Sequence, residues 1–315
     1  MSSVSEHYIY DPCFFIMKRQ KKRKRIQESE LTELMRHVRR DQRYRNLHRH
    51  LKTLKGLVGM KELKDSVVLQ VKYILTTDGK MDSHFLNTVL LGPPGVGKTT
   101  VAEILYNIWM SLDVFTDGMP FAILNRSDMI GSYMGHTATK TRKILNKYAG
   151  SVIFIDEAYS LLNGDKDEYG KEALDQLTAF MGEEKEKTIV IIAGYEDKIE
   201  QQFFGANPGL KRRFGWTFKI EPYTASELFE IFERQLKQCG WTVDKKVLEL
   251  FNREFKKFKN AGGDCENLCF QAKLQYSKNN WTKKRQSKRL SFEHVEKAVA
   301  SYFKETVELN NTMYI

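Results

Sequence analysis

A glycine-rich run that ends in a lysine and a threonine is the strongest chemical signal in this sequence. From Gly92 to Thr99 the chain reads GPPGVGKT, which fits the phosphate-binding pattern G-x-x-x-x-G-K-[ST] at each required position. Glycines let a loop curl until its backbone N–H groups point at phosphate oxygens, and the following helix presents its positive end to them. The run predicts a nucleoside triphosphate site in which Lys98 pairs with the β- and γ-phosphates and the Thr99 hydroxyl is a ligand of Mg²⁺.

A second pattern of chemical interest is an apolar run that ends in two carboxylates. Residues 152–155 read VIFI and are followed directly by Asp156 and Glu157. Because ligands of parallel α/β sheets bind at the carboxyl ends of the strands, we expect these acids beside the glycine-rich loop. Asp156 would belong to the Mg²⁺ shell, while Glu157 would orient and polarise the attacking water.

Alternating apolar and helical segments supply the elements that must position these groups. Five apolar runs are interpreted as buried strands, at residues 87–91, 120–124, 152–155, 188–193 and 216–220. Because helices are expected between them, the sequence predicts a parallel sheet with right-handed crossovers. After Pro222 only helical patterns remain, at residues 225–236, 247–258, 266–276 and 291–306, and Thr224 with Glu227 forms a capping box before the first.

These patterns divide the chain into four predicted parts. Residues 1–55 form a basic extension that is disordered to about residue 28 and continues as one charged helix, an appendage to the core. Residues 56–221 form the large α/β nucleotide-binding domain. Residues 222–307 form a helical lid domain, and residues 308–315 form a tail.

The composition of the 315 residues is that of a globular protein, with 41% hydrophobic and 12% aromatic residues. No window approaches the ~20 apolar residues of a membrane span, so we expect an intracellular, cytoplasmic protein without membrane contact. The net charge of +11 is uneven, because residues 1–50 hold 13 Lys and Arg against 6 Asp and Glu. Their densest run, Lys18 to Arg25, is either a solvated tail, a nuclear-import signal, or a contact for nucleic acid or an acidic partner.

Further motifs narrow the class of nucleotide-binding protein. The N-K-x-D base reader of GTPases is missing, and so are the S-A-T and H-R-x-G-R-x-x-R companions that a DEAD-type helicase needs. A helical region after five α/β units favours AAA+ instead. The chain resembles the CbxX/CfqX (CfxQ-like) family, which includes red-type Rubisco activase and the stage V sporulation protein K group, over about residues 57–303. The motifs that carry this resemblance are LVGM, GPPGVGKTTVA, DMIGSYMGHTATKT, FIDEAYSL, DEYGKEAL, IIAGYED and NPGLKRRF.

The resemblance implies a P-loop AAA+ core, a five-stranded parallel sheet with flanking helices, followed by an all-helical lid. It also implies an ATPase that uses ATP and Mg²⁺, works as a ring, expected to be a homo-hexamer, and remodels a protein client that the sequence does not identify. The alternative is a nucleic-acid-associated AAA+ motor or loader, favoured by the basic tail and by Lys283, Lys284, Arg285, Lys288 and Arg289. A nucleotide-gated scaffold with slow hydrolysis is a third reading.

The resemblance also assigns roles to individual residues. Arg213, or Arg212 beside it, is similar to the arginine finger that reaches a neighbour's γ-phosphate, the alternative being a basic surface turn. Tyr133 lies where the family carries its pore loop and is suited to gripping a peptide, the alternative being a packed core tyrosine. The expected nucleotide site comprises Val58, Gly59, Gly92, Pro93, Pro94, Gly95, Val96, Gly97, Lys98, Thr99, Thr100, Asp156 and Tyr195.

Two positions depart from the usual AAA+ pattern. The fourth strand ends in Gly194 and Tyr195, where most AAA+ proteins carry a sensor asparagine or threonine. Glu266 stands where a second sensor arginine is expected, and an acid cannot neutralise phosphate. That contact therefore comes from elsewhere, with Lys273 as a candidate, or is absent.

Overall fold

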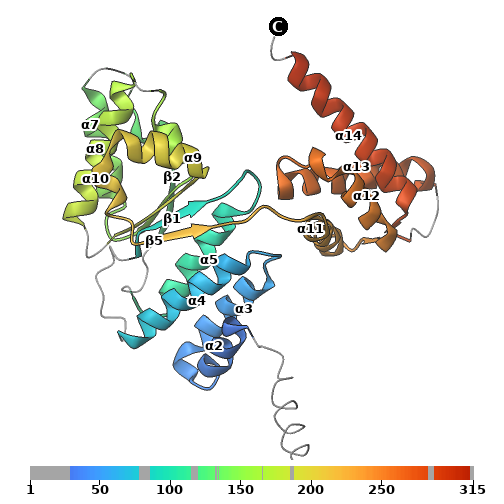
Figure 1. The fold of residues 1–315 in the computed structure, drawn as a ribbon, viewed down its shortest axis with the longest axis horizontal. Coiled ribbons are helices and arrows are strands. Elements are labelled where there is room, and N and C mark those ends of the chain that lie inside the picture. The colour runs from blue at the N-terminus through green and yellow to red at the C-terminus, as the bar shows by residue number, and fades with distance from the viewer. Residues whose placement is uncertain are drawn as a thin grey trace, which may run out of the picture.

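The fold is that of a computed structural model of the chain (Figure 1). It describes residues 29–77, 86–114, 120–131, 133, 135–164, 166–184, 188–282 and 287–312. An α/β body comes first along the chain, and the segment after its last strand leads into a helical region (Figure 1). The predictions for the basic run 18–25 and for residues 283–285 fall outside the described residues.

A parallel five-stranded sheet forms the centre of the α/β body, as predicted. Its strands are β1 (Thr88–Leu91), β2 (Phe121–Leu124), β3 (Val152–Ile155), β4 (Ile189–Gly194) and β5 (Trp216–Lys219), in the order β2-β3-β4-β1-β5. All residues of β1, β3 and β4 are buried, which explains why these segments are continuous apolar runs. Leu91 pairs with Gly194, and Ile155 with Ile192, so the three central strands end at one edge.

Helices cover both faces of this sheet. They are α2 (Glu30–Val38), α3 (Arg45–Gly56), α4 (Lys61–Thr76), α5 (Lys98–Met110), α6 (Arg126–Met129), α7 (His136–Lys147), α8 (Glu168–Glu183), α9 (Glu196–Lys198) and α10 (Pro208–Lys211), with a π-helix at Ile199–Phe204. Figure 1 shows α4 and α5 on one side of the sheet and α7 and α8 on the other. Leu90 belongs to the core under α2 to α5, whereas Val89 and Leu91 belong to the opposite core, as a strand period of two requires.

The lid has its own apolar core, built mainly from helices. These are α11 (Ala225–Gln238), α12 (Leu248–Glu254), α13 (Ala261–Asn280) and α14 (Phe292–Thr312), and a short parallel pair, β6 (Thr242–Val243) with β7 (Arg289–Leu290), was not expected. Phe232, Phe251 and Leu268 lie in this core, which is separate from the two cores of the α/β body. The predicted capping box is confirmed, since the Thr224 side chain accepts from the Glu227 N–H and the Glu227 carboxylate accepts from the Thr224 N–H.

The prediction of a single charged helix over 28–55 is wrong. The chain breaks after α2 and starts again through a 3₁₀ turn, where the Asp41 carboxylate accepts a hydrogen bond from the Arg43 N–H at 3.0 Å. On α3, Leu47, Leu51 and Leu54 are fully buried in the same core as β1 and α5. Residues 29–56 are therefore part of the α/β core rather than an appendage, while the domain boundaries at 55, 221 and 307 stay a prediction.

We expect Leu51→Ala to lower the free energy of unfolding of the α/β body by about 2–5 kcal/mol, because truncation leaves a cavity in a closed core. Chemical denaturation followed by circular dichroism measures the change. Lys52→Ala, on the exposed side of the same turn of α3, is the control and should change the free energy by less than about 0.5 kcal/mol. Equal midpoints for the two variants would show that α3 does not contribute to this core.

Candidate functional site

The glycine-rich loop between β1 and α5 has the strand–loop–helix context that its sequence predicted. Gly95 and Gly97 have φ values of +68° and +90°, in the left-handed region that favours glycine. A Cβ on Gly95 would also collide with the carbonyl oxygen of Asn260 in the lid. The loop therefore needs glycine both for its own curl and for the approach of the lid.

Lys98 begins α5 and turns back over the loop. Its Nζ donates to the carbonyl oxygens of Gly92 at 3.1 Å and Pro93 at 2.9 Å. Burial lowers the pKa of Lys98, while the negative charges of Asp156 and Glu157 act in the opposite direction. A partly desolvated ammonium group whose hydrogen bonds go to neutral carbonyls is well suited to exchange them for phosphate oxygens.

The side chains of Thr99 on α5 and Asp156 after β3 contact each other, as expected of two residues that share a metal ion. The Thr99 hydroxyl donates to Asp156 Oδ2 at 3.2 Å, and Asp156 Oδ1 accepts from the Glu157 N–H at 2.9 Å. Within the described ranges no group of three or more His, Cys, Asp or Glu side chains could hold a metal. A hydroxyl and one carboxylate nevertheless fit Mg²⁺, which usually keeps water and substrate phosphates as its other ligands.

Glu157 has an unusual backbone at the end of β3. Its φ is +47°, and it caps the 3₁₀ turn Ala158–Leu161 while its side chain is exposed. A non-glycine residue in the left-handed region is uncommon and is enriched at functional sites. The left-handed residue turns the chain at the carboxyl end of β3, and the charge of Glu157 acts on Lys98 of the neighbouring loop.

A pair of stacked tyrosines lies next to these groups, and only one of them, Tyr195, was predicted from the sequence. The ring of Tyr195 stacks on that of Tyr159, with centroids 5.5 Å apart and planes at 22°. Lys198 Nζ lies 4.7 Å from the Tyr159 centroid and 5.2 Å from that of Tyr195. Lys98 Nζ lies 5.4 Å from the Tyr195 centroid. Tyr195 is thus placed beside the loop, whereas Tyr159 and Lys198 were missed, although the repeated Tyr in DEAY and GYED was a signal.

The remaining expected nucleotide contacts differ in their surroundings. Val58 is buried and Gly59, with φ +61°, abuts the Glu227 carboxylate of the lid, whereas Thr100 is exposed on α5. A cleft of about 540 Å³ lies beside the loop. Its lining includes Gly92, Pro93, Pro94 and Tyr195 from the expected site and the acidic residues Glu62, Glu196, Asp197 and Glu221.

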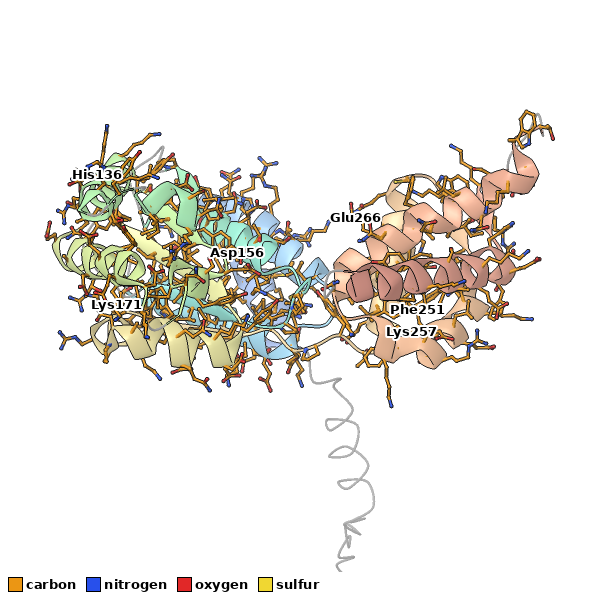
Figure 2. All side chains as sticks on the ribbon, turned by 90° about the horizontal axis from the view of Figure 1, so that it is seen from above. His136, Asp156, Lys171, Phe251, Lys257 and Glu266 are labelled. Atoms are coloured by element: carbon orange, nitrogen blue, oxygen red, sulfur yellow. The ribbon has the colours of Figure 1, made fainter. Side chains whose placement is uncertain are left out.

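The lid donates hydrogen bonds to backbone carbonyls of the loop. Tyr223 donates its hydroxyl to the Val96 carbonyl at 3.0 Å, and the Gly262 N–H donates to the Gly95 carbonyl at 3.1 Å. Figure 2 marks Glu266 on the lid and Asp156 in the α/β body. Glu266 is exposed and Lys273 is half-buried, both on α13. A role for Lys273 in place of the second sensor arginine stays a prediction.

The two candidate finger arginines differ in their surroundings. Arg213 is half-buried, and its Nη1 donates to the Gly209 carbonyl at 2.7 Å. Its own carbonyl accepts from Asn87 Nδ2 at 3.1 Å, which ties the turn before β5 to the start of β1. Arg212 is exposed. The structure therefore presents Arg212 outward, while Arg213 would have to leave a contact within its own subunit to reach a neighbour.

Tyr133 lies on the surface, which contradicts the alternative of a packed core tyrosine. Its side chain is 69% exposed, and its ring meets His136 edge-on, with centroids 5.7 Å apart. Gly135, two residues later, has φ +76° and is the N-cap of α7. Figure 2 labels His136, whose ring contacts Tyr133, at the end of the α/β body away from the lid and apart from Asp156.

Among the described residues, no helix is both long and apolar enough to cross a bilayer.

Sequence comparisons place these features in a known group. Residues 88–208 match the pattern of the ATPase family associated with various cellular activities. The chain is 34% identical to a putative cfxQ-like protein of Acanthamoeba polyphaga mimivirus, over 73% of this chain and 58% of that protein. It is 33% identical to stage V sporulation protein K of Bacillus subtilis, over 62% of each chain. A chloroplastic ribulose bisphosphate carboxylase/oxygenase activase of Cyanidioschyzon merolae is 38% identical over 59% of this chain and 62% of that one. The matches thus span about three fifths of the length of these relatives.

Solved structures agree on the fold. A point mutant of RuvB of Thermotoga maritima superposes with a TM-score of 0.58 at 18% identity, over 79% of this chain and 72% of that one. The FIGL-1 AAA domain gives a TM-score of 0.55 at 19% identity, over 78% and 82% of the two chains. Residues 88–208 thus form an ATPase domain of the AAA type, and the chain as a whole is similar to CfxQ-like proteins.

Proposed function

We propose that this chain is an ATP-dependent protein-remodelling ATPase that hydrolyses ATP to ADP. The observation that carries the proposal is the arrangement at the carboxyl edge of the sheet, where Lys98 Nζ lies over the glycine-rich loop and the Thr99 hydroxyl donates to Asp156. Glu157 is the next residue, and its N–H donates to the Asp156 carboxylate. These groups have the chemistry that phosphoryl transfer to water requires, which is cationic, metal-binding and water-orienting. The CfxQ-like and activase relatives support the same assignment.

In this mechanism each side chain has one task. Lys98 exchanges the Gly92 and Pro93 carbonyls for β- and γ-phosphate oxygens, which places a positive charge where negative charge develops. Thr99 and Asp156 would hold Mg²⁺, which when bound supplies further charge neutralisation at the phosphates. Glu157 accepts a hydrogen bond from the attacking water, orients it in line with the γ-phosphorus and takes up its proton as the new P–O bond forms and the bond to ADP breaks.

The same proposal includes a homo-hexameric ring with ATP at each boundary between subunits. Head-to-tail contacts of one kind close into a ring, so an arginine of one subunit can reach the ATP of the next. Arg212 and Arg213 lie in the turn before β5 and are the candidates. Exposed Tyr133 would grip the protein client, whose identity is not implied by the activase named among the relatives.

No observation favours the alternative of a nucleic-acid motor. Most of the basic residues that suggested it lie outside the described residues, and the likeness to RuvB, at 18% identity, shows the fold alone. The relatives' names also give no support to nuclear import through residues 18–25.

Replacing Lys98 with alanine should weaken ATP binding by about 10- to 100-fold, because charge-assisted hydrogen bonds to the phosphates are lost. Titration with a fluorescent ATP analogue measures this loss. Lys147→Ala, an exposed lysine at the end of α7, is the control and should bind as the unaltered chain does. Unchanged affinity in Lys98→Ala would rule out the loop as the phosphate site.

Glu157→Gln should keep ATP binding and lower turnover by at least ~100-fold, because an amide cannot accept the proton of the attacking water. Steady-state phosphate release and analogue titration on the same preparation separate the two effects. Loss of binding together with turnover would mean that Glu157 supports the loop rather than the chemistry.

Mixing inactive subunits tests the ring and the finger together. If Arg213 acts on a neighbour's ATP, Arg213→Ala and Glu157→Gln subunits mixed at equal ratio should regain up to about a quarter of normal turnover per subunit, the share of head-to-tail interfaces with both groups intact. The same mixture with Arg212→Ala decides between the two arginines. If neither mixture regains turnover at any protein concentration, the site is complete within one subunit and the shared-site model is wrong.

A further inference from the structure

The carboxyl end of α3 is held by two cations that come from different parts of the fold. α3 ends at Gly56, and the last carbonyls of a helix have no partner within it. Lys64 Nζ, on α4, donates to the Leu57 carbonyl at 2.6 Å and reaches the Lys55 carbonyl at 3.5 Å. Arg234, on α11 of the lid, donates through Nη1 to the Gly56 carbonyl. One cation of the α/β body and one of the lid thus lie at the negative end of this helix dipole.

The segment that follows α3 leads directly to the phosphate loop. Gly59 and Met60 have φ values of +61° and +55°, so the chain turns sharply before α4 begins. Met60 is buried in the same core as Val96 of the loop, and a Cβ on Gly97 would lie 3.9 Å from the Met60 methyl carbon. The segment therefore connects the end of α3 with the phosphate loop.

Lys64 controls the direction of the peptide group between Leu57 and Val58. This peptide is trans, and in a trans peptide the C=O and the N–H point in opposite directions. Because the Leu57 carbonyl accepts from Lys64, the Val58 N–H must point away from that lysine. Among the described residues this N–H has no acceptor, although Val58 is only 8% exposed. An unpaired buried N–H is costly, so this group is suited to donate to a ligand.

The lid approaches the same segment at a second point. A Cβ on Gly59 would lie 2.5 Å from Glu227 Oε1. Glu227 and Arg234 lie about two turns apart on α11. The lid helix thus touches the segment at Gly56 and at Gly59, before and after Val58. A movement of the lid would disturb both contacts.

We propose that Lys64 and Arg234 are positioning residues for ATP, which hold the chain at residues 56–57 so that the Val58 N–H points at the base. This inference rests on the proposed ATP site and on the expected contact of Val58 with the nucleotide. Neither cation touches the phosphates. Because their contribution is to the binding of the base, they act on ATP affinity and leave turnover at saturating ATP unchanged.

Lys64→Ala should raise the KM for ATP and weaken the binding of a non-hydrolysable ATP analogue by about 3- to 10-fold, the effect of one misdirected hydrogen bond. The kcat should stay within about 2-fold of that of the unaltered chain. Lys72→Ala, on the same helix and paired with Glu30, is the matched control and should change neither quantity. Unchanged affinity in Lys64→Ala would overturn the proposal, and so would a fall in kcat as large as the rise in KM.

Tripolyphosphate separates the two ends of the nucleotide, because it has phosphates and no base. Its inhibition constant against ATP turnover should be the same in Lys64→Ala as in the unaltered chain, whereas Lys98→Ala should weaken tripolyphosphate and ATP together. Equal weakening of both ligands in Lys64→Ala would mean that this lysine supports the phosphate loop, which contradicts the proposal. If neither ligand binds the unaltered chain, the ATP site itself is wrong, and that result is distinct from a failure of Lys64 alone.

Lys64→Arg is the rescue. It keeps a cationic donor at this position and should regain part of the ATP affinity that Lys64→Ala loses. Equal affinities of the Ala and Arg variants, with tripolyphosphate unaffected in both, would contradict a role for the donated hydrogen bond.

Arg234→Ala tests the contribution of the lid. Because this side chain is exposed, we expect a smaller loss of ATP affinity, about 2- to 5-fold, again without a change for tripolyphosphate. Lys237→Ala, on the same helix and paired with Glu233, is the control and should bind ATP normally. Unchanged ATP affinity in Arg234→Ala would overturn the role of the lid in positioning the base.

Discussion

The register of three parallel strands is the constraint on which the site depends. Leu91 at the end of β1 pairs with Gly194 at the end of β4, and Ile155 at the end of β3 pairs with Ile192. Three separate segments that follow these strands must therefore emerge at one edge: the glycine-rich loop, Tyr195 and the acid pair. A slip of one residue in any of them would turn its side chains to the opposite face, which is also why burial on both faces fixes the arrangement so strongly.

Local motifs made most of this site predictable from the sequence. The loop and the acid pair each lie within a few residues of an apolar strand, and their spacing determines strand, loop and helix without knowledge of distant contacts. The burial of α3 was not predictable in this way. Its leucines are spaced as on any amphipathic helix, and only packing against α5, about 50 residues later, shows that they belong to the core.

The stacked tyrosines illustrate a second limit of sequence reasoning. Tyr159 and Tyr195 are 36 positions apart and follow different strands, so neither position alone indicates a pair. Their contact follows from the sheet order, which makes β3 and β4 neighbours, and from Gly194, which clears the space between them. The sequence places the two arginines in one turn but does not show which way each side chain points. Their exposure and the contact of Arg213 with the Gly209 carbonyl distinguish them.

The contact between lid and loop has a different physical character from the charged contact that an arginine would make. The backbone carbonyls of Gly95 and Val96 accept hydrogen bonds from Gly262 and Tyr223. These bonds use only carbonyl oxygens of the loop, so the N–H groups of its glycines can still point at phosphate oxygens. Such bonds depend on the shape of the loop and carry no net charge. An acid at Glu266 is compatible with this contact, because it leaves both hydrogen bonds intact. The position of the lid therefore depends on the geometry of the phosphate loop, because the lid binds carbonyl groups of the loop's main chain. This contact does not require an arginine at position 266.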